Sequence, residues 1–181
     1  MIELVPLRCI RCDTPVPAEG GEIAWVCSQC GQGLLLDEQK GLESLEIHYS
    51  SNILTGKIGQ PYWVTKGSVD MAREAHQSWK GSDQREADQL WGQKRQFVIP
   101  AFTSSLDDLL RLSTTLFRDP PKLIDGPAMP FEPVTLSPRD LGPLIEYIIL
   151  AVEAGRSDKV KSINVSVEIE PPDLWILADI D

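Results

Sequence analysis

Three features that would narrow the function are missing from this 181-residue sequence. It has no apolar run of about 18 residues, so no membrane-spanning helix is predicted. Met1–Arg8 is too short and too charged for a secretory signal, so we expect a cytoplasmic protein. Basic side chains are scarce, because 17 Lys and Arg stand against 27 Asp and Glu, a formal net charge of -10. Nucleic-acid affinity comes mostly from Lys and Arg, so nucleic acid is an unlikely partner without a local basic patch.

Recognisable catalytic motifs are missing as well. There is no Gly-x-Ser-x-Gly elbow, no Walker loop and no His-Glu-x-x-His helix. The two histidines, His48 and His76, have no nucleophile beside them in the sequence. The sequence therefore names no reaction, and an enzyme would need a site that forms only in three dimensions.

What the sequence does contain is enough material for folded domains. Its hydrophobic content of 42% and charged content of 24% are ordinary for a globular protein. Its length suits one sizeable domain with a small additional module. Disorder is not expected for most of the chain.

All four cysteines fall in one short stretch, as two Cys-x-x-Cys pairs separated by 14 residues. They are Cys9, Cys12, Cys27 and Cys30. Each pair places two thiolates on the same side of a tight turn, and two such turns complete a tetrahedron of sulfur ligands about 2.3 Å from a zinc ion. Disulfides seldom persist in a reducing cytoplasm. The spacing therefore predicts one structural zinc ion held by these four residues.

With Gly31 directly after the second pair, residues 6–36 resemble the zinc-ribbon, or rubredoxin-like, zinc-finger family. One departure is Asp13, where many ribbons carry glycine, although Asp tolerates the left-handed conformation better than most residues. Ribbons of this kind occur in transcription factors, ribosomal proteins, enzymes and adaptors. The resemblance therefore implies a metal site and a small β-fold, but no particular activity.

Other uses of the four sulfurs are less well supported. Iron also binds tetrahedral sulfur sites and stays an alternative metal. A redox dithiol would need one exposed pair at a helix start, and a catalytic zinc would need an open coordination position that four thiolates do not leave. Arg8 and Arg11 flank the first pair, either to contact phosphate or to offset the negative charge of the metal–thiolate centre. The acidic surroundings favour the second interpretation.

The turn signal Asp37–Gly41 predicts a boundary between a zinc ribbon at residues 1–38 and a second domain at residues 39–181. Alternating or β-branched segments in the second domain predict strands at 42–49, 61–65, 96–103, 163–169 and 174–180. Pro171-Pro172-Asp173 is interpreted as a turn between the last two strands. The predicted class is α+β: a zinc ribbon followed by an antiparallel sheet with two packed helices.

The two helices are predicted from their caps and apolar periodicity. Thr103 or Ser104 is the expected cap of a helix that ends at Arg118, ahead of a proline pair. Ser137 is the expected cap of the other, which ends near Gly155. Residues 66–96 are harder to assign and are interpreted as two short helices or one long hairpin excursion.

The aromatic residues give the only hint of a partner surface. Trp63, Trp79 and Trp91 belong to a third of the chain that is rich in aromatics, and tryptophan is favoured at protein interfaces. Tryptophan is also a common core residue, and core packing is the favoured reading for this group. The three residues are nevertheless the candidates for partner binding.

The leading functional hypothesis is a non-enzymatic zinc-ribbon protein that acts as an adaptor or assembly subunit through protein–protein contacts. The first alternative is a nucleic-acid or transcription-associated ribbon protein, in which Arg8 and Arg11 would matter. The second alternative is an enzyme whose site is not visible in the sequence.

Overall fold

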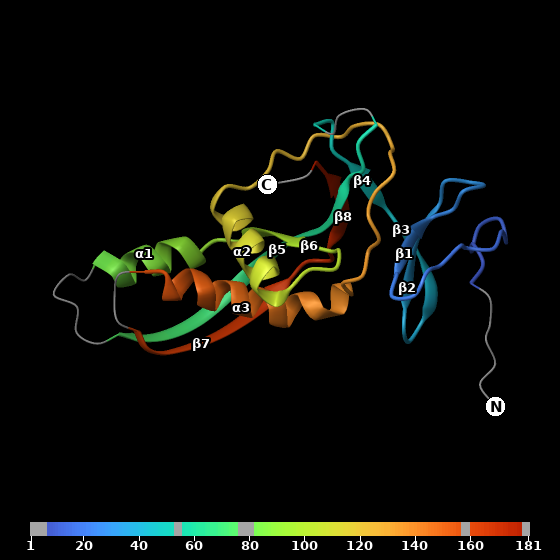
Figure 1. Ribbon diagram of the computed structural model, residues 1–181. Helices are drawn as coiled ribbons and strands as arrows, with labels where there is room; N and C mark the ends of the chain where they lie inside the picture. Colours follow the sequence, from blue (N-terminus) through green and yellow to red (C-terminus); the bar gives the residue numbers. More distant parts are fainter. Residues whose placement is uncertain (1–6, 53–55, 76–81, 157–159, 179–181) are drawn as a thin grey trace.

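Two separate β-sheets and three α-helices form the described part of the chain (Figure 1). The structure is a computed structural model, and it describes residues 7–52, 56–75, 82–156 and 160–178. The elements in chain order are β1 (Ala24–Val26), β2 (Gly33–Asp37), β3 (Gly41–Leu45), β4 (Ile47–Tyr49), β5 (Gln60–Ala75), α1 (Ser82–Trp91), β6 (Arg95–Pro100), α2 (Leu106–Arg118), the 3-10 turn η1 (Pro138–Asp140), α3 (Leu141–Ala154), β7 (Val160–Ile169) and β8 (Asp173–Leu177). The predicted α+β class is confirmed, with one helix more than the two expected.

The smaller sheet has the antiparallel order β1-β2-β3. The predicted turn Asp37–Gly41 forms, but it closes a hairpin instead of joining two domains. The Asp37 carboxylate accepts the backbone N–H groups of Gln39 and Lys40 at 2.9 Å, and Gly41 takes a φ of 85°. This sheet therefore continues to Leu45, past the boundary that the sequence predicts at residue 38.

The larger sheet is organised by β5, which pairs with three other strands. Its order is β4-β8-β5-β6, and β7 pairs with β5 further along. β6 lies along one edge of β5, and β8 and β7 lie end to end along the other. β6 is an edge strand, as its proline predicts. The expectation of a purely antiparallel sheet is wrong at one edge, because β4 runs parallel to β8.

The turn predicted at Pro171-Pro172-Asp173 does not reverse the chain. β7 and β8 both run antiparallel to β5: β7 pairs with Gly67–Ala75 and β8 with Gln60–Val64. Proline has no N–H to donate, so the pair interrupts the hydrogen bonding between strands without ending it. The Thr65 hydroxyl donates to the Glu170 carbonyl at 2.7 Å and bridges the interruption.

Residues 66–96 fall between the two predicted alternatives: β5 and β6 pair antiparallel at the two ends of this stretch, as in a long hairpin, and the helix α1 lies between them. Met71 and Ala75, which fit a helical spacing, lie on β5, because pairing with β7 extends this strand well past the predicted stretch 61–65. Ala87, Leu90 and Trp91 also fit a helical spacing, and they do lie on a helix, α1, where Ala87 and Trp91 are buried. Residues 76–81 lie outside the described part of the chain, and with them His76 and Trp79.

Helix α2 begins one residue later than predicted. Ser105, not Thr103 or Ser104, is the cap, and its hydroxyl accepts the backbone N–H of Asp108 at 3.1 Å. The sequence Ser-Ser-Leu-Asp-Asp offers two overlapping Ser-x-x-Asp spacings, so the pattern alone does not select between them. A cap of this kind contributes about 1 kcal/mol.

Ser137 caps the helical segment that leads into α3, as predicted. Its hydroxyl accepts the Arg139 N–H at 3.3 Å and begins η1, and α3 follows and stops at Gly155. None of the helices in the described ranges is long and apolar enough to cross a membrane.

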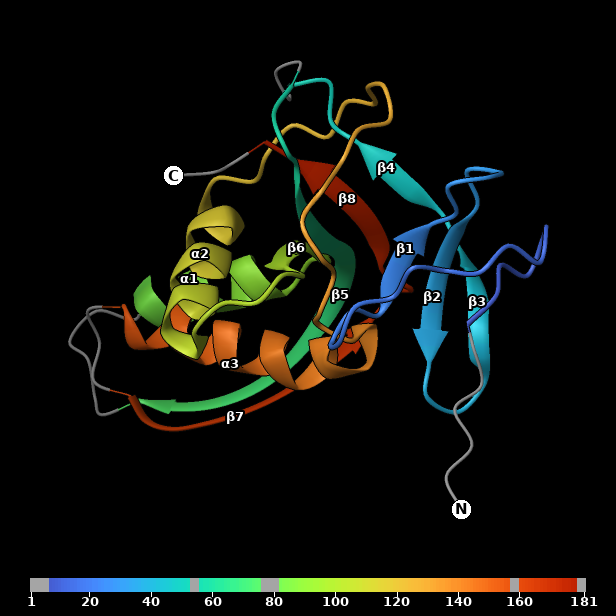
Figure 2. The ribbon, with the colours of Figure 1, turned by 45° about the vertical axis from the view of Figure 1, so that its right-hand side comes forward.

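The main core lies between the helices and the larger sheet. β5 and β7 curve around the three helices (Figure 2). The fully buried side chains include Trp63, Phe97, Ile99, Leu141, Ile145, Ile148, Ile149, Leu174 and Ile176. Burial of each large apolar side chain contributes about 1.5–3 kcal/mol, so this cluster is the main source of stability.

The smaller sheet is attached to this core through β1. The Ile23 N–H donates to the Val134 carbonyl at 2.9 Å, and Ala24 is buried against Val134 in the main cluster. Figures 1 and 2 place this sheet at the opposite end of the molecule from α1. The cysteine-bearing turns are thus fixed to the larger domain.

Candidate metal centre

The first cysteine pair lies in a tight turn whose backbone hydrogen bonds hold both thiols on one side. The Asp13 N–H donates to the Cys9 carbonyl, and the Cys9 N–H donates to the Thr14 carbonyl, each at 2.9 Å. The Arg11 N–H donates to Cys9 Sγ at 3.5 Å. Asp13 has a φ of 59°, so it adopts the left-handed conformation that glycine would otherwise supply. The departure from glycine at this position therefore leaves the turn intact.

The second cysteine pair repeats this geometry. The Gly31 N–H donates to the Cys27 carbonyl, and the Cys27 N–H donates to the Gln32 carbonyl, again at 2.9 Å. Gly31 has a φ of 70° and occupies the place that Asp13 occupies in the first turn. Two equivalent turns thus face each other, as the paired spacing predicts.

The four sulfur atoms come together between the two turns. Cys9 Sγ lies 3.6 Å from Cys30 Sγ, and Cys12 Sγ lies 3.5 Å from Cys27 Sγ. All four lie within 4.8 Å of one another, and none forms a disulfide. A tetrahedral ion with metal–sulfur bonds of about 2.3 Å separates its ligands by about 3.8 Å. The four residues predicted as ligands are therefore positioned to hold one metal ion.

Crowding separates the pKa values of these thiols. The Thr14 hydroxyl, 3.2 Å from Cys12 Sγ, is the largest cause that lowers the pKa of the Cys12 thiol to about 6. At Cys30 the Gln32 backbone N–H lowers the pKa, but burial and the three neighbouring cysteines outweigh it and raise the pKa to about 12. Four thiolates side by side therefore need a cation to offset their charge. A divalent metal ion would supply that charge.

The apolar core around the sulfurs is small. Cys9, Cys27 and Leu34 are buried together, with Val16 and Leu42 partly buried against them. Modules of fewer than about 40 residues usually need a metal or disulfides to fold stably. Four thiolates also occupy all four coordination positions of a tetrahedral ion and leave none for a substrate or a reactive water. The arrangement suits a structural role.

The two arginines of the first turn have different surroundings. The Arg8 guanidinium pairs with the Asp13 carboxylate at 3.2 Å and also donates to its carbonyl at 3.0 Å. Both side chains are well exposed, so the pair adds little stability. Arg11 is exposed as well, and its backbone N–H contacts the cluster through Cys9 Sγ.

Two of the three tryptophans considered for partner binding lie in the core. Trp63 is fully buried, and its Nε1–H donates to the Leu136 carbonyl at 2.7 Å. Trp91 is only 4% exposed and stacks on Phe117. Neither indole reaches the surface, which agrees with the core-packing interpretation. Trp79 lies outside the described residues.

A charged contact that the sequence does not reveal ties the smaller sheet to the larger domain. The Arg139 guanidinium donates to the Asp37 carboxylate at 2.8 Å, and the Asp37 side chain is only 13% exposed. The backbone N–H of Gln39 is the largest cause that lowers the pKa of Asp37, and Arg139 lowers it further. The two partners lie 102 residues apart, so no local pattern pairs them.

A second hidden contact lies between α1 and α3. The Glu153 carboxylate is fully buried and accepts the Trp91 Nε1–H at 2.8 Å and the Arg156 Nε–H at 2.7 Å. The helical spacing of the sequence places Trp91 on an apolar face, but gives no sign of its acidic partner. This contact fixes the indole inside the core.

Comparison of the chain with protein-family models, with curated proteins and with solved structures finds no match. The metal centre and the surface of the larger domain are thus the features on which a function can be argued.

Proposed function

We propose that this protein is a non-enzymatic adaptor or assembly subunit that binds a protein partner through the outer face of α3. In this proposal one zinc ion, held by Cys9, Cys12, Cys27 and Cys30, stabilises a zinc ribbon that contains the smaller sheet. The observation that carries the partner-binding role is the apolar surface of α3.

Helix α3 is apolar on the side that faces away from the core as well as on the side that faces it. Its inner face buries Leu141, Ile145, Ile148, Ile149 and Val152. Its outer face exposes Pro143, Tyr147, Leu150 and Ala154. Tyr147 is 60% exposed and Leu150 is 37% exposed. The other large exposed apolar side chains of the described residues lie outside α3: Ile10, Ile58, Leu106 and Ile124.

These four residues form one continuous stripe, which we call the α3 stripe. They follow the spacing i, i+4, i+7 and i+11, which returns to the same side of an α-helix. At 1.5 Å per residue the stripe is about 16 Å long. A helix that is apolar all round is usually buried, so the α3 stripe is better suited to a partner than to water.

The charge of the chain indicates which partner fits. Glu146 flanks the α3 stripe, and the chain as a whole has a net charge of -10. This excess of negative charge disfavours nucleic acid and disfavours a second copy of the same chain. The expected partner is a different protein that offers an apolar centre bordered by Lys or Arg.

The zinc ion in this proposal has a structural role. The two equivalent turns and the sulfur distances of 3.5 and 3.6 Å suit a tetrahedral ion with four thiolate ligands. Zinc is favoured over iron because it is the usual ion of paired Cys-x-x-Cys turns with this spacing.

The experiment is quantitative affinity capture from the native cells with tagged full-length protein. Tyr147→Asp and Leu150→Asp place a charge in the α3 stripe. Leu106→Asp is the matched control, because Leu106 is 59% exposed at the start of α2, outside the stripe. Thermal melting of each variant accompanies the capture, so that loss of folding is recognised.

We expect one protein to co-purify at near-equal amount with the wild type and with Leu106→Asp. Both stripe variants should lose it while they melt within a few degrees of the wild type. The proposal is refuted if Leu150→Asp still captures the partner, if Leu106→Asp loses the partner to the same extent, or if no protein co-purifies with the wild type.

A further inference from the structure

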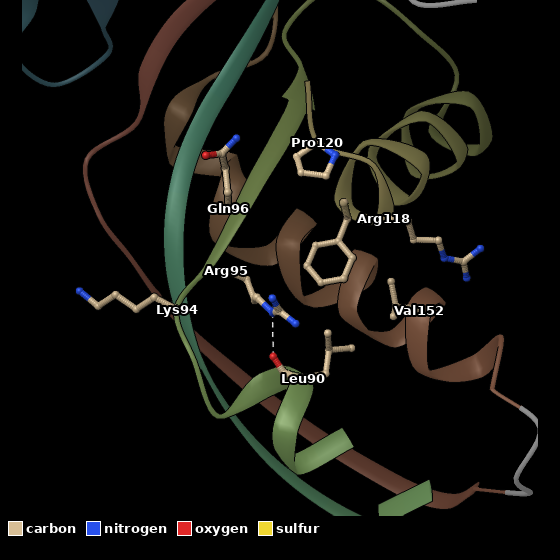
Figure 3. A pocket seen from close by; sticks show the side chains of 8 residues that line it. Leu90, Lys94, Arg95, Gln96, Arg118, Pro120 and Val152 are labelled. Atoms are coloured by element: carbon tan, nitrogen blue, oxygen red, sulfur yellow. Dashed lines mark hydrogen bonds between the residues drawn. The ribbon is translucent and has the colours of Figure 1, made fainter. Parts of the chain in front are cut away.

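A cavity of about 500 Å³ lies in the larger domain, and Figure 3 draws the residues that line it. It opens where the last turns of α1, α2 and α3 meet the beginning of β6. Its volume falls within the range of about 300–1,000 Å³ that small-molecule sites have. None of the four candidate zinc ligands lines it, and the α3 stripe does not include its α3 residue, Val152.

The lining of this cavity is basic and apolar, with no acidic side chain. The apolar part is Leu90, Phe117, Pro120 and Val152, and the polar part is Lys94, Arg95, Gln96 and Arg118. Acidic residues outnumber basic ones in this chain by 27 to 17. Three cations around one cavity are therefore unlike the rest of the sequence. They fit an anionic ligand.

Arg95 is the best placed of the three cations. Its side chain is half-buried, and its Nε–H donates to the Leu90 carbonyl at the end of α1 at 2.7 Å (Figure 3). An arginine has five N–H donors, so this bond fixes the guanidinium and leaves four donors on its two terminal nitrogens. Those nitrogens form no ion pair with any residue in the described ranges. The group is thus oriented and free to bind an oxyanion.

Arg118 and Lys94 contribute differently. Arg118 is exposed at the end of α2 and forms no ion pair within the described part of the chain. Lys94 donates to the Glu170 carboxylate at 2.6 Å, and its side chain points away from Arg118 and Val152 in Figure 3. Arg118 is therefore a second available cation, whereas Lys94 is already paired.

The apolar part of the lining is held rigidly by aromatic stacking. The half-buried Phe117 ring stacks on Trp91 at 5.2 Å with an angle of 21° between the rings, and on Phe97 at 5.5 Å and 23°. Trp91 is fixed in turn by its hydrogen bond to Glu153. A flat apolar ligand would find a surface that does not need to rearrange.

We propose that this cavity binds a small organic carboxylate with a flat apolar body. The carboxylate pairs with the Arg95 guanidinium, Arg118 adds a second cation, and the body lies against Phe117, Leu90 and Val152. Planar carboxylates match the fork of N–H donors that arginine offers. Lys94 is the one lining residue that could act as a nucleophile or a base, and it is paired with Glu170, so we propose binding and no reaction.

The same arginines have a competing structural explanation. The C-terminal end of each helix carries a partial negative charge, and three such ends meet at this cavity. Arg95 already donates a hydrogen bond to a carbonyl in the last turn of α1. Arg118 lies close to the end of α3, because its Nη2 would be 3.3 Å from a Cβ atom added to the cap residue Gly155. If neutralising these ends were their whole role, no anion would bind.

Isothermal titration of the full-length, metal-loaded protein with 2-naphthoate and with neutral 2-naphthamide separates the two explanations. The variants are Arg95→Gln and Arg118→Gln. The matched control is Arg111→Gln, because Arg111 is exposed on α2, pairs with Asp108 and lies outside the cavity. Thermal melting of each variant reports its folding.

We expect the wild type to bind naphthoate saturably and to bind the amide about tenfold more weakly. The affinity for naphthoate should fall about tenfold in Arg95→Gln and a few-fold in Arg118→Gln, and it should not change in Arg111→Gln. If Arg95→Gln does not fold, the amide and Arg118→Gln decide the outcome. Absence of saturable binding up to about 10 mM, equal binding of acid and amide, or an equal loss in Arg111→Gln would overturn the proposal.

Discussion

Replacing Trp91 by phenylalanine separates a core role for this residue from a role in partner binding. Trp91 donates its Nε1–H to a carboxylate of Glu153 that is fully buried, at 2.8 Å. Trp63 is the matched comparison, since it is fully buried too but donates to a neutral carbonyl, that of Leu136, at 2.7 Å. Phenylalanine removes the donor in both cases and keeps an aromatic ring.

The charge of the acceptor decides the expected difference between the two variants. A hydrogen bond to a charged group contributes about 1.5–3 kcal/mol, whereas one to a neutral group contributes about 1 kcal/mol. Both variants also lose packing of the same indole atoms, by similar amounts. Trp91→Phe should therefore lower the free energy of unfolding by about 1 kcal/mol more than Trp63→Phe. For a chain of this size that is a further drop in Tm of about 2–4 °C.

Urea unfolding followed by circular dichroism, on metal-loaded protein at neutral pH, measures both free energies. The reasoning is refuted if Trp63→Phe destabilises the protein as much as Trp91→Phe. A Trp91→Phe variant of wild-type stability that no longer captured the protein partner would instead favour the partner-binding role.

Two further predictions concern the metal centre and its link to the larger domain. Metal analysis should find about one zinc per chain. The double variant Cys12→Ser/Cys27→Ser should lose this zinc, and its three-stranded sheet should exchange backbone hydrogens faster, whereas the control Ser28→Ala on the second turn should keep both the zinc and the slow exchange. A double variant that retained its metal would contradict the assignment of the site. The backbone N–H groups of the turn that follows Asp37, and the Arg139 guanidinium, lower the pKa of its carboxyl group. The ionised carboxylate therefore stabilises the folded protein above the ordinary pKa of 3.8, and this contribution is lost as the pH falls through the lowered pKa. Asp37→Asn should therefore be less stable than the wild type at neutral pH, and the difference in unfolding free energy should vanish in acid; a constant difference would show that the charge is irrelevant.

The metal centre could be predicted from sequence because each of its two turns is built by local interactions, and the paired spacing relates the two turns to each other. Each turn is closed by bonds within six residues, from Cys9 to Thr14 and from Cys27 to Gln32. The chain supplies glycine, or an aspartate that tolerates the same conformation, where each turn needs it. The helix that ends at Arg118 was predictable for the same reason, because proline and capping signals act over one or two turns.

The features that escaped prediction depend on partners far along the chain. Met71 and Ala75 fit a helical spacing, and only pairing with β7 makes them part of a strand. The Asp37–Arg139 contact joins residues that no periodicity relates. The cavity is lined by four elements, so its basic character is invisible until Arg95 and Arg118 are brought to the same place.

The pairing of β5 with β7 and β8 also sets the order in which parts of this protein can fold. The three-stranded sheet and the four-cysteine cluster lie within residues 7–45, so all their residues are present early in synthesis. The larger sheet must wait for residues 160–177, which hydrogen-bond along one edge of β5. Until then that edge presents unpaired N–H and C=O groups over most of its length, which makes the newly made chain prone to association with other strands. We therefore expect this edge of β5 to gain its partners only after β7 and β8 have been made.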